Sequence, residues 1–317
     1  NGEKFIRSAY QEILNQNIDN FEIIFVDNNS QDDSVKIINQ IVESDTRVSL
    51  LHEGKQGAAA ARNKGLKYFK GEFVYFFDVD DRLAKNSLIF LLDALITNEK
   101  YDSVFGDRQV IRDNNDGHDV YNGNGNLVFK NKPYWGKEWF GNVSKLKGPP
   151  SFMHRKRVFS TIKHFNEHLL LGEDADFHIR LGVKCNVIYA KKLIYYYYRH
   201  SNSTVSKANQ RKRNSEKVFQ YWPRIYKAHI PFVLQEELPP VFKKMLLRKV
   251  YGSVVKMITL TTGLKNRINL KNDLYKQMVP IQKPIWFRFF VDFALLFRSI
   301  YLHKFFVFYV LRNRIKL

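Results

Sequence analysis

Over residues 1–204 the chain alternates between segments with helical spacing of apolar residues and short, nearly continuous apolar runs. Helices are predicted at 5–15, 33–43, 57–69 and 87–98, and strands at 21–26, 48–52, 73–77 and 102–105. Unbroken apolar strands are typical of parallel sheets that are buried on both faces. The alternation predicts an α/β fold with a mostly parallel sheet flanked by helices. Such sheets bind ligands at the carboxyl ends of their strands.

The pattern changes twice further along the chain. Residues 112–150 are rich in Asn, Gly and Trp and predict long loops. An aromatic strand then ends at Ser201-Asn202-Ser203-Thr204 and gives way to polar, helix-compatible sequence. We therefore expect one domain over 1–204 and a separate helical region over 205–317.

Charge supports the same boundary. The chain of 317 residues has a formal net charge of +20, and residues 205–317 contain 23 Lys and Arg against 5 Asp and Glu. This region therefore carries +18 and the first 204 residues only +2, which predicts an anionic partner for the second region. A single cysteine, Cys185, excludes an internal disulfide and a cysteine-based zinc cluster. It suits a reducing compartment, so we expect a cytoplasmic location.

The most apolar stretch of the basic region reads IWFRFFVDFALLFRSIYLHKFFVFYVL over 285–311. Charges interrupt it too often for a comfortable membrane span. On one continuous helix, Arg288, Asp292, Ser299 and His303 share a narrow arc, opposite Trp286, Phe289, Phe290, Phe293, Phe297, Ile300 and Tyr301. A broad aromatic face with basic flanks predicts a helix that lies on an anionic membrane surface. Packing on the first domain or in a homo-oligomer stays open as an alternative.

Three acids stand at the end of the strand predicted at 73–77. Asp78, Asp80 and Asp81 fall within four positions, although a single Asp there would be an ordinary turn or helix cap. Carboxylates this close raise one another's pKa unless a cation lies among them, and hard oxygen ligands suit Mg²⁺ or Mn²⁺. A divalent ion that also holds a diphosphate explains the cluster.

These acids carry a family resemblance. Phe77-Asp78-Val79-Asp80-Asp81 resembles the Asp-X-Asp motif of nucleotide-sugar glycosyltransferases of the GT-A fold, in particular the inverting family 2. Four further segments follow the order of that family: 24–34 with Asp27 and Asn28, 57–66 with Arg62, 171–177 with Asp174, and 195–204 with His200. The family's first strand is missing, and Asn1 is expected to be its last residue. We therefore expect the chain to be a fragment.

The resemblance implies a Rossmann-like GT-A domain over 1–204 in a bacterial enzyme. The enzyme would transfer a sugar from a nucleotide sugar, a UDP-sugar first of all, to a saccharide or lipid-linked saccharide. The product would be surface polysaccharide or lipopolysaccharide, made at the inner face of the plasma membrane. The implied site consists of Mn²⁺ or Mg²⁺ on Asp80, Asp78 and His200, donor contacts from Asp27, Asn28, Arg62, Asp78 and Asp80, and Asp174 as general base.

Each segment also has a purely structural interpretation. Residues 57–66 are alanine-rich and suit a tightly packed helix, and Glu173 and Asp174 suit the first turn of a helix. The resemblance places Trp135, Trp139 and Gly148-Pro149-Pro150 near the acceptor pocket, and a core or hinge role is open for each tryptophan.

Two other classes of function compete with the enzyme. One is a non-catalytic sugar- or lipid-binding scaffold, against which the complete set of acids argues. The other is a nucleic-acid-binding protein, which the basic region permits. Its aromatic residues are too contiguous and apolar for a stacking surface that faces water, so no nucleic-acid partner is expected.

Overall fold

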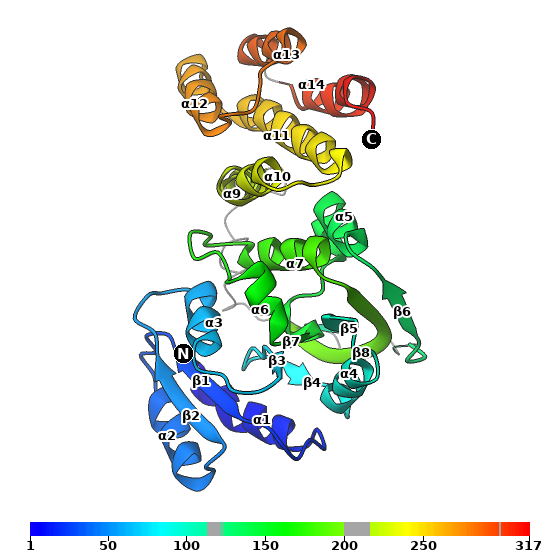
Figure 1. Cartoon of the computed structure of the whole chain (residues 1–317). Coiled ribbons are helices and arrows are strands. Elements are labelled where there is room, and N and C mark those ends of the chain that lie inside the picture. Colours follow the sequence, from blue (N-terminus) through cyan, green and yellow to red (C-terminus); the bar gives the residue numbers. More distant parts are fainter. Residues whose placement is uncertain (113–120, 122, 200–215, 298) are drawn as a thin grey trace. The chain divides into compact units, whose positions relative to one another are not determined.

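The chain folds into two units, Asn1–Ser203 and Thr204–Leu317 (Figure 1). The structure is a computed structural model that describes residues 1–112, 121, 123–199, 216–297 and 299–317.

The first unit begins with a small parallel sheet. Strand β1 (Ile23–Asp27) pairs in parallel with β2 (Val48–His52), with Asp27 opposite His52 at their carboxyl ends. Helix α2 (Ser34–Ser44) connects the two strands, and α1 (Glu3–Leu14) packs against it. Their shared core contains Ile6, Ile23, Phe25, Ile38, Ile41 and Val48. This is the βαβ arrangement that the alternating pattern predicts.

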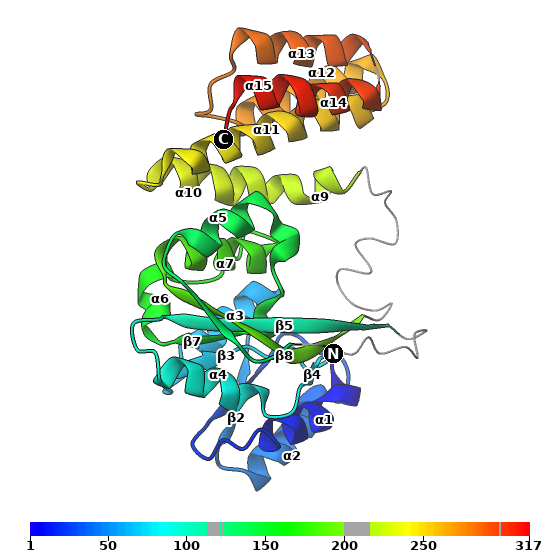
Figure 2. The same cartoon turned by 90° about the vertical axis from the view of Figure 1, so that its right-hand side faces the viewer.

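A second sheet has the order β3-β7-β5-β8-β4, with β6 added on β8. Its strands are β3 (Phe73–Tyr75), β4 (Arg82–Leu83), β5 (Ser103–Arg112), β6 (Leu127–Lys130), β7 (Phe152–Arg155) and β8 (Val187–Arg199). Among the described pairs in this sheet, β5 and β8 are parallel and run side by side (Figure 2), while the other pairs are antiparallel. The α/β class with flanking helices is confirmed, but the sheet is mixed rather than mostly parallel. The expectation rested on the βα order before residue 105, whereas each described antiparallel pair of this sheet includes a later strand, β7 or β8.

Helices cover both faces of the second sheet. Helix α4 (Ser87–Ile96) lies on one face, and α5 (Tyr134–Gly141) and α7 (Glu173–Lys184) lie on the other (Figures 1 and 2). Helix α4 contributes Leu88, Leu91 and Leu95 to a core shared with Val104, Ile188 and Ile194. The shorter helices α3 (Ala58–Leu66) and α6 (Arg157–Ile162) complete the described helices of this unit.

The region 112–150 is more ordered than predicted. Its described part contains β6, α5 and the 3₁₀ turns Val143–Lys145 and Pro149–Ser151. The prediction of long loops is therefore wrong for these residues, because aromatic side chains give α5 a buried face. Trp139 is 1% exposed and its ring lies 5.3 Å from that of Phe105, so of the two roles left open for it, the structure places it in the core.

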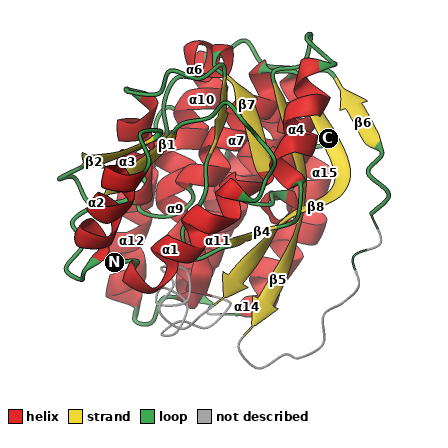
Figure 3. Cartoon of the chain, turned by 90° about the horizontal axis from the view of Figure 1, so that it is seen from below, coloured by secondary structure: helices red, strands yellow, loops and turns green. Residues whose placement is uncertain are grey.

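The described elements of the second unit are all helical (Figure 3). They are α9 (Lys217–Arg224), a π-helical turn Ile225–His229, α10 (Ile230–Gln235), α11 (Pro240–Leu260), α12 (Leu264–Gln277), α13 (Ile285–Leu296), α14 (Ile300–Phe305), the π-helical η5 (Phe306–Leu311) and α15 (Arg312–Arg314). Helix α11 is central and packs against α9, α10, α12, α13 and α14. In the described residues, no helix is long and apolar enough to cross a membrane.

The stretch 285–311 is not one continuous helix. Phe297 leaves the helical conformation at φ −110° and ψ 103°, and the Ser299 hydroxyl accepts a hydrogen bond of 3.2 Å from the Tyr301 N–H to start α14. A serine at this position is a strong helix-start signal, because it satisfies an N–H that has no partner in the helix. The expectation of one continuous helix over 285–311 is therefore wrong beyond Leu296.

Two glycines set the contact between α5 and α7. A Cβ atom added to Gly182 would lie 2.5 Å from the Gly136 nitrogen and 2.8 Å from the Trp135 carbonyl carbon. Main-chain atoms cannot move aside as a flexible side chain can. The two helices therefore approach this closely only because both positions lack a side chain.

We predict that Gly182→Ala lowers the free energy of unfolding by about 1–3 kcal/mol, since overpacking forces the helices apart. Urea denaturation measures this change. Gly65→Ala in α3 is the matched control, because its added Cβ would meet only Val26 Cγ2 at 3.7 Å. The control should be neutral or slightly stabilising, as Ala favours helix over Gly. Equal unfolding curves for the two variants would contradict the close approach.

Candidate active site

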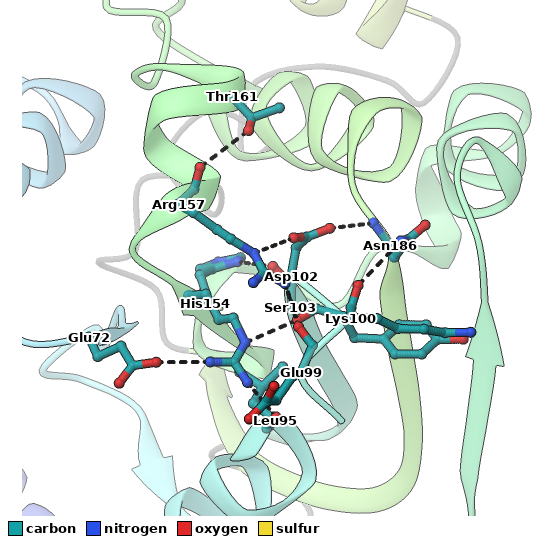
Figure 4. Close-up of polar contacts among 12 residues, drawn as sticks. Glu72, Leu95, Glu99, Lys100, Asp102, Ser103, His154, Arg157, Thr161 and Asn186 are labelled. Atoms are coloured by element: carbon teal, nitrogen blue, oxygen red, sulfur yellow. Dashed lines mark hydrogen bonds and ion pairs between the residues drawn. The ribbon is translucent and has the colours of Figure 1, made fainter. Parts of the chain in front are cut away.

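The strand that leads to the three acids is fixed at its start by a buried polar network (Figure 4). Arg155 donates to Glu72 at 2.9 Å, to the Leu95 carbonyl at 2.6 Å and to the Tyr101 carbonyl at 3.1 Å. Glu72 immediately precedes β3, and Arg155 ends β7. These bonds join the residue before β3 to the ends of α4 and β7.

The three acids lie in three different surroundings. The chain turns after Tyr75, and the Asp81 N–H donates to the Asp78 carbonyl at 3.0 Å. Asp81 is only 4% exposed and accepts a 3.1 Å hydrogen bond from the Tyr198 N–H of β8. The Asp78 side chain is 43% exposed, and Asp80 is half-buried. Asp81 therefore faces the sheet, and Asp78 faces outward.

Burial, together with the nearby Asp78, raises the pKa of Asp81 to about 8. The hydrogen bond from Tyr198 opposes this shift, and Asp80 adds to it. Asp81 is therefore mostly protonated at neutral pH while no cation lies among the acids. The crowding that the sequence raised as a problem is resolved in part by a proton on the innermost acid.

Arg62 of α3 joins the acid cluster to another segment. Its Nη2 atom lies 3.1 Å from Asp78 Oδ1, and its Nη1 atom lies 3.3 Å from Glu173 Oε1. The side chain is 12% exposed, and its guanidinium carbon lies 5.4 Å from the centre of the Phe165 ring. Although burial opposes it, Asp78, Glu173 and Asp174 raise the pKa of Arg62. The guanidinium lies between two carboxylates, and the expected donor contact of Arg62 stays a prediction.

Asp174 stands in the first turn of α7. Gly172 precedes the helix in the left-handed conformation, at φ 83°, and the first turn contains Glu173, Asp174 and Asp176. Acids are stabilised there by the helix dipole. Asp176 is buried and pairs with Arg180 at 2.9 Å, whereas Asp174 is half-buried and accepts a 2.7 Å bond from the Ala175 N–H. Burial and the charge of Asp174 raise the pKa of Glu173. One helix turn thus holds a structural acid and a more accessible one.

The end of β1 carries the other two predicted residues. Burial opposes ionisation of Asp27, but hydrogen bonds from Ser30 and His52 hold its pKa below the usual range. Asn28 donates to the carbonyls of Glu53 and Lys55, each at 2.8 Å, and accepts from the Gly57 N–H at 2.7 Å. Asn28 therefore holds the loop before α3, with both amide hydrogens already donated.

No group of three His, Cys, Asp or Glu side chains that could hold a metal occurs among the described residues. His200 lies outside them. A Mg²⁺ ion bound through nucleotide phosphates takes only one or two protein carboxylates, and the phosphates and water complete its ligand shell. The accessible Asp78 carboxylate and the half-buried Asp80 carboxylate, two residues apart, fit this kind of ion.

A loop that sequence reasoning left vague borders the acids. The carbonyl of Lys147 accepts hydrogen bonds from Tyr195 at 2.5 Å and from Arg108 at 2.6 Å. Gly148 follows at φ 93°, and a Cβ there would lie 2.9 Å from the Tyr195 hydroxyl. Asp78 and Asp81 both act on the pKa of Tyr195, which burial raises well above its usual value. The string Gly148-Pro149-Pro150 was the one sequence signal for this loop.

Comparison with known proteins relates the first unit to a family. Residues 1–155 match the family model described as Glycosyl transferase family 2. This match covers just under half of the chain, and it agrees with the predicted similarity to glycosyltransferase family 2.

The chain is 38% identical over 99 residues to an uncharacterized glycosyltransferase of Haemophilus influenzae, over 31% of this chain and 40% of that protein. It is 27% identical over 282 residues to the GalNAc(5)-diNAcBac-PP-undecaprenol beta-1,3-glucosyltransferase of Campylobacter jejuni, over 88% of this chain and 85% of that protein. The match thus spans less than half of the first relative and most of the second.

Among solved structures, TarS 1-349 of S. aureus in complex with UDP-GlcNAc is similar, with a TM-score of 0.66 at 18% identity. The match covers 96% of this chain and 87% of TarS 1-349. This likeness concerns the fold, and it confirms the expected GT-A architecture.

We predict that Asp81→Asn changes how stability depends on pH. A carboxyl whose pKa rises from 3.8 to about 8 on folding contributes less stability as pH rises between these values, because the folded state binds the proton more tightly. Asparagine retains the oxygen that accepts from Tyr198 and does not ionise. Urea unfolding with EDTA present should therefore favour the variant over the wild type more at pH 8 than at pH 5. If the free energies of unfolding of the variant and the wild type differed equally at both pH values, the raised pKa would be contradicted.

Proposed function

We propose that the chain is a metal-dependent inverting glycosyltransferase that transfers a sugar from a nucleotide-sugar donor, most simply a UDP-sugar, to a saccharide or lipid-linked saccharide. One observation carries the proposal. Arg62 contacts both Asp78, at the end of the β3 segment, and Glu173, which adjoins Asp174. Arg62 thus joins one acid suited to a diphosphate-bound cation, Asp78, to the residue next to the acid suited to proton transfer, Asp174.

The donor side of the proposed reaction uses the ends of two strands. Asp27, kept ionised by its hydrogen bonds, is proposed to contact the nucleoside. Asp80 and Asp78 are proposed to hold Mn²⁺ or Mg²⁺, with His200 as a further ligand. When bound, this ion would neutralise negative charge that develops on the leaving nucleoside diphosphate. Asn28 is proposed to act only through the loop that it holds.

The acceptor side uses Asp174. We assign it as the general base that takes the proton from the acceptor hydroxyl as that oxygen attacks the anomeric carbon. The bond to the diphosphate breaks on the opposite side of the same carbon, so one displacement inverts its configuration. Asp174 is half-buried, whereas Asp176 is buried and paired with Arg180, which supports the assignment of Asp174 as the acid that meets the acceptor.

The relatives support a lipid-linked acceptor. The Campylobacter jejuni protein is named for glucosyl transfer to a saccharide on undecaprenol diphosphate. The TarS structure contains UDP-GlcNAc, which supports a UDP-sugar donor. We therefore propose a role in bacterial surface polysaccharide or lipopolysaccharide synthesis, at the inner face of the plasma membrane.

The second unit is proposed to hold the enzyme on that surface. Helices α13 and α14 and η5 expose a row of apolar side chains, which we call the aromatic row: Ile285, Phe289, Phe293, Leu296, Tyr301, Phe305, Phe308 and Tyr309. The rings of Phe290 and Phe305, 6.3 Å apart, join its two halves. Arg288 and Lys304 of the same helices, and Arg312 and Arg314 of α15, are also exposed. Exposed apolar and basic side chains on these helices fit an anionic lipid surface.

The reaction is tested by separating binding from chemistry. With UDP and Mn²⁺, thermal stabilisation should occur in the wild type and be lost in Asp80→Asn. Asp174→Asn should keep the stabilisation but lose at least about 100-fold in transfer or hydrolysis of a UDP-sugar, as expected for loss of a general base.

Asp19→Asn, at an exposed position of the first unit, is the matched control and should behave as the wild type. Stabilisation by UDP without metal, or normal turnover in Asp174→Asn, would contradict these roles. A wild type that neither binds nor cleaves any nucleotide sugar would favour the scaffold alternative.

The membrane contact is tested with the double variant Phe289→Ser/Phe293→Ser. Each phenylalanine contributes about 1.5–3 kcal/mol when fully buried, so partitioning onto anionic vesicles should fall at least about tenfold. Ile268→Ser on α12, at 41% exposure, is the control that also removes an exposed apolar residue. Equal vesicle binding by the double variant and the control would exclude the aromatic row as the contact. Tighter binding to RNA than to vesicles would favour the nucleic-acid alternative.

A further inference from the structure

Arg62 contacts its two carboxylates in unequal ways. Toward Asp78 a single nitrogen, Nη2, approaches both oxygens, at 3.1 and 3.5 Å. This is weaker than the two parallel hydrogen bonds of a bidentate pair. Toward Glu173 the other terminal nitrogen, Nη1, donates at 3.3 Å. Asp78 is 43% exposed, whereas Glu173 is 16% exposed. The contact to Asp78 is therefore the more accessible to a competing cation.

The ionised form of Glu173 depends on the guanidinium more than that of Asp78 does. It is largely buried and adjoins Asp174, which repels it. A buried carboxylate is stable only when it is paired, and Arg62 is the partner that the structure gives it. Because Glu173 and Asp174 are consecutive residues, whatever holds Glu173 also sets the position of the peptide that carries Asp174.

We infer that Arg62 is a positioning residue that couples donor binding at Asp78 to the placement of Asp174, acting through Glu173. This inference rests on the proposed function. A donor complex that engages the oxygens of Asp78 competes with Arg62 for them. The guanidinium then interacts with Glu173 alone, which fixes the start of α7 when the donor is present. Arg62 itself needs no contact with the donor.

A neighbouring residue, Asn63, holds the segment before α7 in place without Arg62. Asn63 is buried, donates to the Phe165 carbonyl at 2.9 Å and to Glu167 at 2.8 Å, and accepts from the Phe165 N–H at 2.9 Å. These bonds join α3 to the segment that leads to Glu173. Removal of the Arg62 charge therefore leaves these Asn63 hydrogen bonds in place, while the link between the two carboxylates is lost.

The test is a double-mutant cycle of Arg62→Gln and Glu173→Gln with two readouts. Calorimetry should show that UDP with Mn²⁺ binds Arg62→Gln as tightly as the wild type or more tightly, because a competitor for Asp78 has gone. Each single variant should lose about tenfold or more in kcat with donor KM nearly unchanged. The double variant should be no slower than the worse single variant, because the two residues act as one unit.

Arg62→Lys should recover part of kcat, since a lysine keeps the charge, and Lys70→Gln at an exposed position beyond α3 is the matched control. A tenfold or greater loss of UDP–Mn²⁺ binding in Arg62→Gln would make Arg62 a donor ligand and overturn the inference. A loss of kcat in the double variant that equals the product of the two single losses would also overturn the inference. Failure of the wild type to bind UDP with Mn²⁺ would overturn the proposed function itself, so the two failures are distinguishable.

Discussion

The first unit depends on one electrostatic constraint, which is the convergence of carboxylates from separate segments around a single buried guanidinium. Asp78, Glu173 and Asp174 all raise the pKa of Arg62, although burial opposes its charge. Like charges at such spacing cannot all remain ionised without a cation. The structure meets the constraint in two ways. Arg62 neutralises the acids that it contacts, and Asp81, which it does not contact, has a pKa of about 8 and holds a proton.

The fold supplies this convergence through rigid elements. Arg62 comes from a short helix whose start is fixed by Asn28. Asp78 follows a strand fixed by Arg155 and Glu72, and Glu173 opens a helix that packs tightly on α5. Arg62 and Glu173 stand on helices, and Asp78 lies three residues after the end of β3. Charges that are held next to rigid elements keep fixed distances, which is what stabilisation of developing charge requires.

Much of the first unit could be predicted from sequence because its signals are local. Strand β2 has the predicted bounds, Val48–His52, and α4 begins at the predicted Ser87. The acids of the candidate site were found because three carboxylates in four positions are unusual at a strand end. The Arg62–Glu173 pair and the contacts of Asn28 were missed. The first joins residues 111 positions apart, and the contacts of Asn28 span up to 29 positions. Contacts at such separations leave no periodic pattern in the sequence.

The sheet and the C-terminal helices show where local patterns mislead. Periodicity predicts that a strand exists but not which strand it pairs with, so the antiparallel partners of β8 were not foreseen. In the second unit, 285–311 was predicted as one continuous helix. The capping hydrogen bond of Ser299 begins a new helix there instead. Within α13, Phe287 and Val291 are buried against α11 while Phe289 is 64% exposed. An aromatic-rich helix can therefore supply its own unit's core from one side and still present phenylalanines to its surroundings from another. The described part of 285–311 therefore contributes to the core of its own unit and also exposes apolar residues.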